Sequence, residues 1–142
     1  MDYVLDTNVC IALIKNTDSS VRGRFQKVSR AGGIMYVPSI VTFELWYGVA
    51  NSTRIAFNTD RLEAFLSGRL NILPFDDGDA RAAGAIRADL EVSGRIISGR
   101  IIGPYDLLIA GQALARQFTL VTANVSEFSR VKGLSWQDWA KP

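Results

Sequence analysis

The sequence contains no histidine and a single cysteine among its 142 residues. The missing histidine excludes Ser-His-Asp and Cys-His catalysis, histidine-ligated zinc and imidazole acid–base chemistry. The lone cysteine, Cys10, cannot form an internal disulfide, and its apolar neighbours predict core packing rather than a reactive thiol. Any catalysis must therefore use carboxylates, hydroxyls, lysine, arginine or a metal.

Long hydrophobic runs are also missing from the sequence. No apolar stretch reaches the length of a membrane span, and the N-terminus lacks a basic segment followed by an apolar one. We therefore expect a soluble, unsecreted protein with no membrane partner. A single cysteine fits a reducing cytoplasm.

The bulk composition predicts one ordinary globular domain, residues 1–142. The chain is 48% hydrophobic and 21% charged, which is enough apolar material for a real core. The net charge of +2 is weak support for an anionic partner. Arginine outnumbers lysine, which favours phosphate contacts, although scattered solvated charge explains these numbers equally well.

Short apolar runs alternate with helical patterns along the chain. This βαβα order predicts an α/β fold with three α/β/α layers around a parallel sheet of about four to five strands. Ser39 is a plausible N-cap for the helix that follows Pro38. Strands are predicted at 2–5, 34–37, 70–73, 118–122 and 134–136, and helices at 8–15, 18–30, 39–50, 54–67, 76–92 and 105–117.

Three carboxylates stand in apolar surroundings, namely Asp6, Glu44 and Asp106. Ionised acids are almost never buried without a partner, and a shared divalent cation is the simplest partner for three of them. Carboxylate oxygens suit Mg²⁺ or Mn²⁺. Taken singly, Asp6 and Asp106 could merely cap helices, and Glu44 could lie on a solvated helix face.

The predicted topology brings these acids together. Ligands of parallel α/β sheets gather at the carboxyl ends of the strands. Asp6 follows the first strand, the helix bearing Glu44 follows the second, and Asp106 begins the helix that leads to the strand ending at Thr122. Thr7 and Thr122 could bond a carboxylate or finish a strand, Asn124 could simply form a turn, and Glu127 could be a surface charge.

A metal held by such acids lowers the pKa of a bound water and polarises a phosphoryl oxygen. That chemistry needs no histidine. Hydrolysis of a phosphodiester is therefore the reaction class that the residues favour.

Five motifs, read together, resemble the PIN domain and, within it, the VapC toxins of bacterial toxin–antitoxin pairs. The resemblance covers essentially the whole chain. A lone Asp-Thr-Asn would be a weak signal, but several motifs in order at suitable spacing are a specific one. The motifs are Leu5–Asn8 (LDTN), Ser39–Gly48 (SIVTFELWYG), Gly103–Gly111 (GPYDLLIAG), Leu120–Phe128 (LVTANVSEF) and Val131–Trp139 (VKGLSWQDW).

This resemblance implies a Mg²⁺- or Mn²⁺-dependent endoribonuclease that acts as the toxin of a type II toxin–antitoxin system. It implies homodimers that are inhibited by a VapB antitoxin whose tail enters the acidic groove. The close subgroup is similar to toxins that cut the anticodon loop of initiator tRNA. By motif position, Asp6, Glu44 and Asp106 match the family's metal site, Glu127 its fourth acid, and Thr7, Asn8, Thr122 and Asn124 supporting positions.

One feature departs from the family pattern. The pentapeptide SGRII occurs twice in tandem, at 93–97 and 98–102, immediately before the loop that presents Asp106. A surface loop tolerates such an insertion, but a shifted Asp106 would slow catalysis. The alternatives are therefore an attenuated PIN module that binds antitoxin or RNA without cutting, and a domain-swapped dimer through residues 93–102. A receiver-type phosphotransferase fits poorly, because the lysines lie at unsuitable places.

Overall fold

The computed structural model describes residues 1–92 and 102–141. Its centre is a parallel sheet of five strands in the order β3-β2-β1-β4-β5. Adjacent strands pair in parallel register, with Val4 of β1 opposite Tyr36 of β2 on one side and Leu120 of β4 on the other. The strands are β1 (Asp2–Leu5), β2 (Ile34–Pro38), β3 (Asn71–Leu73), β4 (Thr119–Val121) and β5 (Trp136–Gln137).

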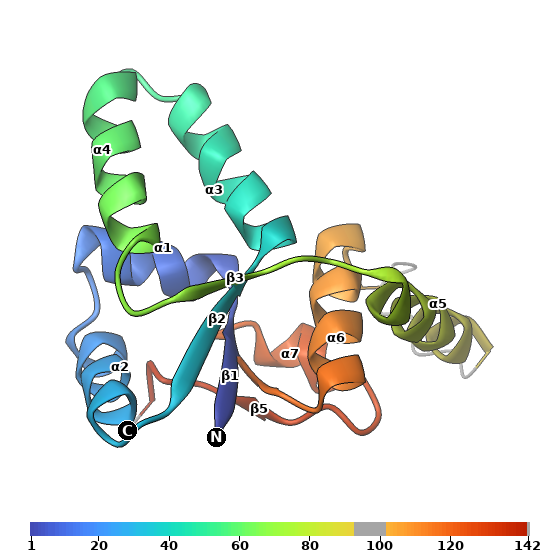
Figure 1. The fold of residues 1–142 in the computed structure, drawn as a ribbon. Coiled ribbons are helices and arrows are strands. Elements are labelled where there is room, and N and C mark those ends of the chain that lie inside the picture. The colour runs from blue at the N-terminus through green and yellow to red at the C-terminus, as the bar shows by residue number, and fades with distance from the viewer. Residues whose placement is uncertain (93–101, 142) are drawn as a thin grey trace.

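Seven helices surround this sheet in the described part of the chain. Figure 1 shows α1 and α2 to one side of the sheet and α5 and α6 to the other, which gives three layers. The hairpin of α3 and α4 rises beyond the end of β2. The helices are α1 (Thr7–Lys15), α2 (Ser19–Arg30), α3 (Ser39–Ala50), α4 (Ile55–Leu66), α5 (Asp77–Val92), α6 (Pro104–Arg116) and α7 (Val125–Phe128).

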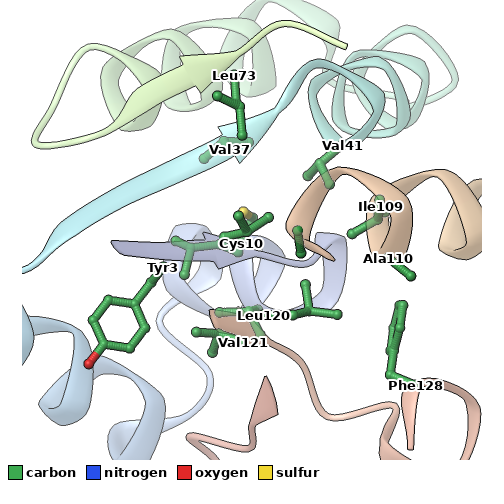
Figure 2. Close-up of a cluster of buried hydrophobic side chains, with 14 of the residues drawn as sticks. Tyr3, Cys10, Val37, Val41, Leu73, Ile109, Ala110, Leu120, Val121 and Phe128 are labelled. Atoms are coloured by element: carbon green, nitrogen blue, oxygen red, sulfur yellow. The ribbon is translucent and has the colours of Figure 1, made fainter. Parts of the chain in front are cut away.

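The core forms where the central strands meet the helices. Val4, Leu5 and Leu120 are fully buried, as central parallel strands require because helices cover both faces. Figure 2 shows side chains of strands and helices meeting in this core, among them Val41 from α3 and Ile109 from α6. Cys10 is fully buried there, and burial raises the pKa of its thiol, so its predicted packing role is confirmed.

Helix α6 lies unusually close to α5. A Cβ atom added at Gly111 would lie 2.6 Å from the Cβ of Ala83, a separation that real side chains do not tolerate. Glycine is therefore required at this crossing. The close approach fixes the position of α6, which carries Asp106 near its N-terminus.

A network of polar side chains holds the start of α5 to α6. Asp76 and Asp79 form a reciprocal capping box, each side chain accepting the backbone N–H of the other residue at 3.0–3.1 Å. Gln112 and Arg116 of α6 both donate to the buried Asp79 carboxylate. Their contact with Pro74 O, at 2.9 and 3.2 Å, ties the end of β3 to the same helix.

The predicted α/β class and its parallel sheet are confirmed. The predicted helices and strands all occur, with ends shifted by one or two residues. The predicted cap at Ser39 is wrong: Pro38 takes the N-cap position without a side-chain bond, and the Ser39 hydroxyl instead accepts from Phe75 N at 3.3 Å. The short helix α7 was not predicted.

The tandem repeat lies almost wholly outside the described residues. Of residues 93–102, the structure describes only Ile102, which is buried with 2% of its surface exposed. The expectations of a domain swap or a displaced Asp106 through this segment therefore stay predictions. Among the residues described, no helix is both long and apolar enough to span a bilayer.

Candidate active site at the carboxyl edge of the sheet

Asp6 is the most buried of the candidate acids, with 4% of its surface exposed. It follows β1 directly and is the N-cap of α1, where its Oδ1 accepts from Thr7 N at 2.7 Å. Its Oδ2 accepts from the Thr122 hydroxyl at 2.8 Å. Burial raises the pKa of this carboxyl above its ordinary value, although the two hydrogen bonds pull it down. Asp6 is thus both the N-cap of α1 and a candidate site residue.

Thr7 connects Asp6 to the second acid. Its hydroxyl donates to Glu44 Oε1 at 2.8 Å, while its backbone N–H donates to Asp6. Glu44 lies on α3 and is half-buried. One threonine therefore holds two carboxylates from two different helices in a fixed relation.

Thr122 performs the same task from the other side. It is fully buried at the end of β4, and its hydroxyl oxygen accepts from Asn124 N at 2.9 Å while its proton goes to Asp6. The Asn124 amide in turn donates to Asp106 Oδ2 at 3.2 Å. The chain of hydrogen bonds thus joins Asp6 to Asp106 through β4.

Asp106 is the acid most affected by its neighbours. Burial and the charges of Asp6, Glu44 and Glu127 together raise its pKa to about 6, which the Asn124 amide only partly offsets. Like charges at close range raise one another's pKa in this way. The charges of Asp6, Glu44 and Glu127 thus all reach Asp106, in keeping with the common edge that the sheet topology predicts.

Glu127 reaches this region from α7, the helix that the sequence did not predict. Its Oε2 also pairs with Arg130 Nη1 at 3.4 Å, one turn further along. Asn8 differs from the other candidates, because its side chain is exposed in the first turn of α1 and has no part in the hydrogen bonds described above.

The donor set has the chemistry of a divalent-cation site, since it consists of carboxylate oxygens whose mutual repulsion a cation would relieve. In residues 1–92 and 102–141, however, no three acidic or other metal-ligating side chains lie close enough to hold an ion as they stand. The assignment of Asp6, Glu44 and Asp106 as metal ligands therefore stays a prediction.

A groove adjoins the acidic site on its α3 side. Its volume is about 220 Å³, and it lies between α1, α3 and α4. Glu44 lines it together with two cations, Lys15 and Arg61. Arg61 is fixed there by donating to Ile14 O at 2.9 Å. The rest of its wall is largely apolar, including Ile11, Ile14, Leu45, Val49 and Leu62.

Known proteins resemble this chain over nearly its whole length. The PIN domain model matches residues 3–134. The tRNA(fMet)-specific endonuclease VapC of Shigella flexneri is 40% identical over 99% of each chain. Ribonuclease VapC2 of Rickettsia felis is 38% identical over 99% of this chain and 100% of that protein.

Solved structures match over the same extent. The structure of VapBC2 from Rickettsia felis bound to a promoter DNA fragment has a TM-score of 0.88 and 37% identity, covering 98% of this chain and 99% of that chain. VapBC-1 from nontypeable Haemophilus influenzae has a TM-score of 0.84 and 33% identity, covering 99% and 100%.

A parallel sheet of this order with an acid-lined carboxyl edge defines a PIN domain, and the chain belongs to that family. Within the family it is a member of the VapC group.

Proposed function

We propose that this chain is the toxin of a VapBC-type toxin–antitoxin pair and cleaves RNA as an endoribonuclease. The observation that carries the proposal is the hydrogen-bonded arrangement at the carboxyl edge of the sheet, in which Thr7 joins Asp6 to Glu44 and Thr122 and Asn124 join Asp6 to Asp106. Burial, together with the charges of Asp6, Glu44 and Glu127, raises the pKa of Asp106 to about 6. Relatives named as ribonucleases and as a tRNA(fMet)-specific endonuclease support the proposal. The RNA we propose as substrate is a structured one, with the tRNA anticodon loop as the first to test.

We also propose Mg²⁺ or Mn²⁺ as the cofactor, held by Asp6, Glu44 and Asp106. A bound divalent cation supplies a water of lowered pKa and neutralises charge on the phosphodiester. Thr7 and Thr122 keep the Glu44 and Asp6 carboxylates oriented. Asn124 orients Asp106, and Glu127 adds negative charge opposite it.

The partners we propose are a VapB-type antitoxin and a second copy of this chain. The matched structures are those of VapBC2 from Rickettsia felis and VapBC-1 from nontypeable Haemophilus influenzae, which supports the antitoxin. The groove beside Glu44 offers such a chain an apolar floor.

The test is cleavage of total RNA and of tRNA by the purified protein, with Mg²⁺ or Mn²⁺ and then with EDTA. We expect discrete cuts that require metal and that disappear in the variant Asp6→Ala. Asp60→Ala is the matched control, because Asp60 is an exposed aspartate on α4. If the Asp6→Ala protein still cleaved RNA, the assignment of these acids to the active site would be wrong. A folded protein that cuts no RNA with metal present would remove the activity itself.

A further inference from the structure

Two exposed aromatic rings lie next to two of the acids in sequence. Phe43 precedes Glu44 on α3, and Tyr105 precedes Asp106 on α6. Their side chains are 52% and 46% exposed. The two rings nevertheless meet, with centroids 5.6 Å apart and planes inclined at 66°. They form an edge-to-face pair that connects α3 to the start of α6.

The position of this ring pair is informative. Single exposed apolar residues are common and need no explanation. These two come from distant parts of the chain, however, and each is the immediate neighbour of a candidate site acid. Helix packing alone does not require them, because roughly half of each ring remains in water.

We propose that Phe43 and Tyr105 form a stacking platform for unpaired RNA bases beside the bond that is cut. The proposal rests on the ribonuclease function proposed above and names the form of RNA that the same site takes. Bases of single strands and loops can stack on aromatic side chains, whereas bases within a duplex are not accessible.

The electrostatics of the site explain why such a platform is useful. Without a bound cation, Asp6, Glu44, Asp106 and Glu127 repel a polyanion, and a single divalent cation offsets only part of that charge, so phosphate attraction is weak at this edge of the sheet. Base–aromatic stacking is attractive whatever the charge of the backbone and tolerates every base. The rings thus provide affinity at the place where the acids remove it.

A protein partner is the other occupant to consider for these rings. Phe43 shares its face of α3 with two further exposed aromatic residues, Trp46 and Tyr47, which is a pattern that a protein partner could also cover. The contact of Phe43 with Tyr105, which precedes Asp106 on α6, favours the substrate of the acids as the occupant. An interface with another protein is therefore treated as one outcome of the experiment.

The experiment measures binding in the Asp6→Ala background, where we expect no cleavage. The probe is a short single-stranded RNA that carries a fluorescent adenine analogue, whose emission falls when the base stacks. The variants Phe43→Leu and Tyr105→Leu remove a flat ring and keep an apolar side chain, and Tyr105→Phe keeps the ring. Phe57→Leu is the matched control, because Phe57 is 45% exposed on α4 with the Arg54 guanidinium 4.1 Å from its ring.

We expect Phe43→Leu and Tyr105→Leu each to weaken binding roughly tenfold or more and to abolish the fluorescence change. Tyr105→Phe and Phe57→Leu should bind as the parent does. The ratio of the parent's affinity to that of each leucine variant should be the same at low and at high salt, because stacking does not release counterions whereas phosphate contacts do. A lost phosphate contact would instead matter less as salt rises.

Three results would overturn the platform. The first is unchanged binding and quenching in both leucine variants. The second is equal affinity for a fully paired RNA. The third is a change in oligomeric state by light scattering with RNA binding intact, which would assign the rings to a protein interface. The two proposals can fail separately. If the Asp6→Ala protein quenches the probe but the unsubstituted protein cuts no RNA with metal present, Phe43 and Tyr105 still bind unpaired bases and only the ribonuclease proposal fails.

Discussion

At the scale of single residues, the burial of Asp106 and the negative charges around it predict an effect on stability. Its pKa of about 6 lies above the ordinary value of 3.8. The stability that its protonated form provides is therefore complete below the ordinary value and is lost as the pH rises through about 6. Ionisation of Asp106 thus weakens the metal-free protein at neutral pH.

The variant Asp106→Asn should consequently be more stable than the parent at pH 7.5 in EDTA. The residue is half-buried, so we expect a gain of about 1 kcal/mol after allowance for solvent screening. The gain should vanish near pH 4, where the parent is protonated as well. Urea unfolding at both pH values measures it, with Asp60→Asn as the control. If Asp106→Asn and the parent were equally stable at pH 7.5, the raised pKa of Asp106 would be contradicted.

Thr122 gives a second prediction at this scale. Thr122→Val removes the donor to the buried Asp6 Oδ2 and the acceptor for Asn124 N. An unsatisfied buried group costs about 1–3 kcal/mol, so the free energy of unfolding should fall by that amount, and RNA cleavage should fall with it. Thr119→Val, on the same strand, is the control. A stable Thr122→Val protein would show that the bond to Asp6 is dispensable.

At the scale of elements, the capping box of α5 and the side chains of α6 form a clamp. Burial alone would raise the pKa of Asp79, but bonds from Arg116, Asp76 N–H and Gln112 lower it below its ordinary value. The stabilisation is therefore present above the unfolded-state pKa and is lost as the pH falls through the lower, folded-state pKa.

Asp79→Asn should therefore lower the free energy of unfolding by roughly 1–2 kcal/mol at pH 7, because Arg116 and Gln112 lose a charged acceptor while Arg116 keeps Asp76 at 3.3 Å. The difference from the parent should shrink as the solution is acidified below about pH 4. Asp77→Asn, an exposed position in the same first turn, should change little. A loss in Asp79→Asn that does not depend on pH would indicate a packing defect instead.

The tandem repeat is a further feature at this scale. Deletion of residues 98–102 leaves a single copy of SGRII before Gly103, the N-cap of α6. Five added residues between two elements cost little chain entropy, so we expect the full chain to cleave RNA already and the deletion variant to cleave at a rate within a few-fold of it. Cleavage found in the deletion variant alone would show that the repeat silences the site.

The elements were largely predictable because strong local signals coincide with the tertiary contacts. The run Tyr3–Leu5 is apolar and becomes a buried central strand, and Asp76 to Asp79 carries the capping chemistry that starts α5. Ser39 shows the limit of local signals. A serine after proline is a good N-cap in isolation, but its hydroxyl bonds Phe75, which is distant in the sequence.

The candidate site divides in the same way. The acids could be found because acidic residues within apolar runs are unusual, and topology then placed them at one edge. The donors between them were found only as one of two alternatives, since a hydroxyl near a strand end can bond a carboxylate or simply finish the strand, and the structure confirms the first. Thr7 is bonded to Glu44 across 37 positions, and Thr122 to Asp6 across 116. The bonds of Gln112 and Arg116 to Asp79 were not predicted either, because Asp79 belongs to another helix.

At the scale of the whole molecule, the groove beside Glu44 lies between the carboxyl edge of the sheet and the α3–α4 hairpin. An antitoxin that lies in it would cover the wall of the acidic site and the apolar floor together. Gly48 lines this groove, and a Cβ atom added there would meet nothing within 4 Å. A larger side chain at Gly48 should therefore fill the groove without disturbing the fold.

The variant Gly48→Leu accordingly tests whether protection by antitoxin depends on this groove. A VapB protein is first chosen because its co-expression restores growth to cells that express the unsubstituted chain. We expect Gly48→Leu to inhibit growth as strongly as the parent but to lose most of the protection by that VapB protein.

Gly84→Leu is the matched control, because Gly84 is a helical glycine with open space around it on α5, away from the groove. Each change replaces glycine by a better helix former, so helix stability alone cannot separate them. Full protection of cells carrying Gly48→Leu would place the antitoxin elsewhere on the molecule, and loss of toxicity would show that the groove serves the RNA instead.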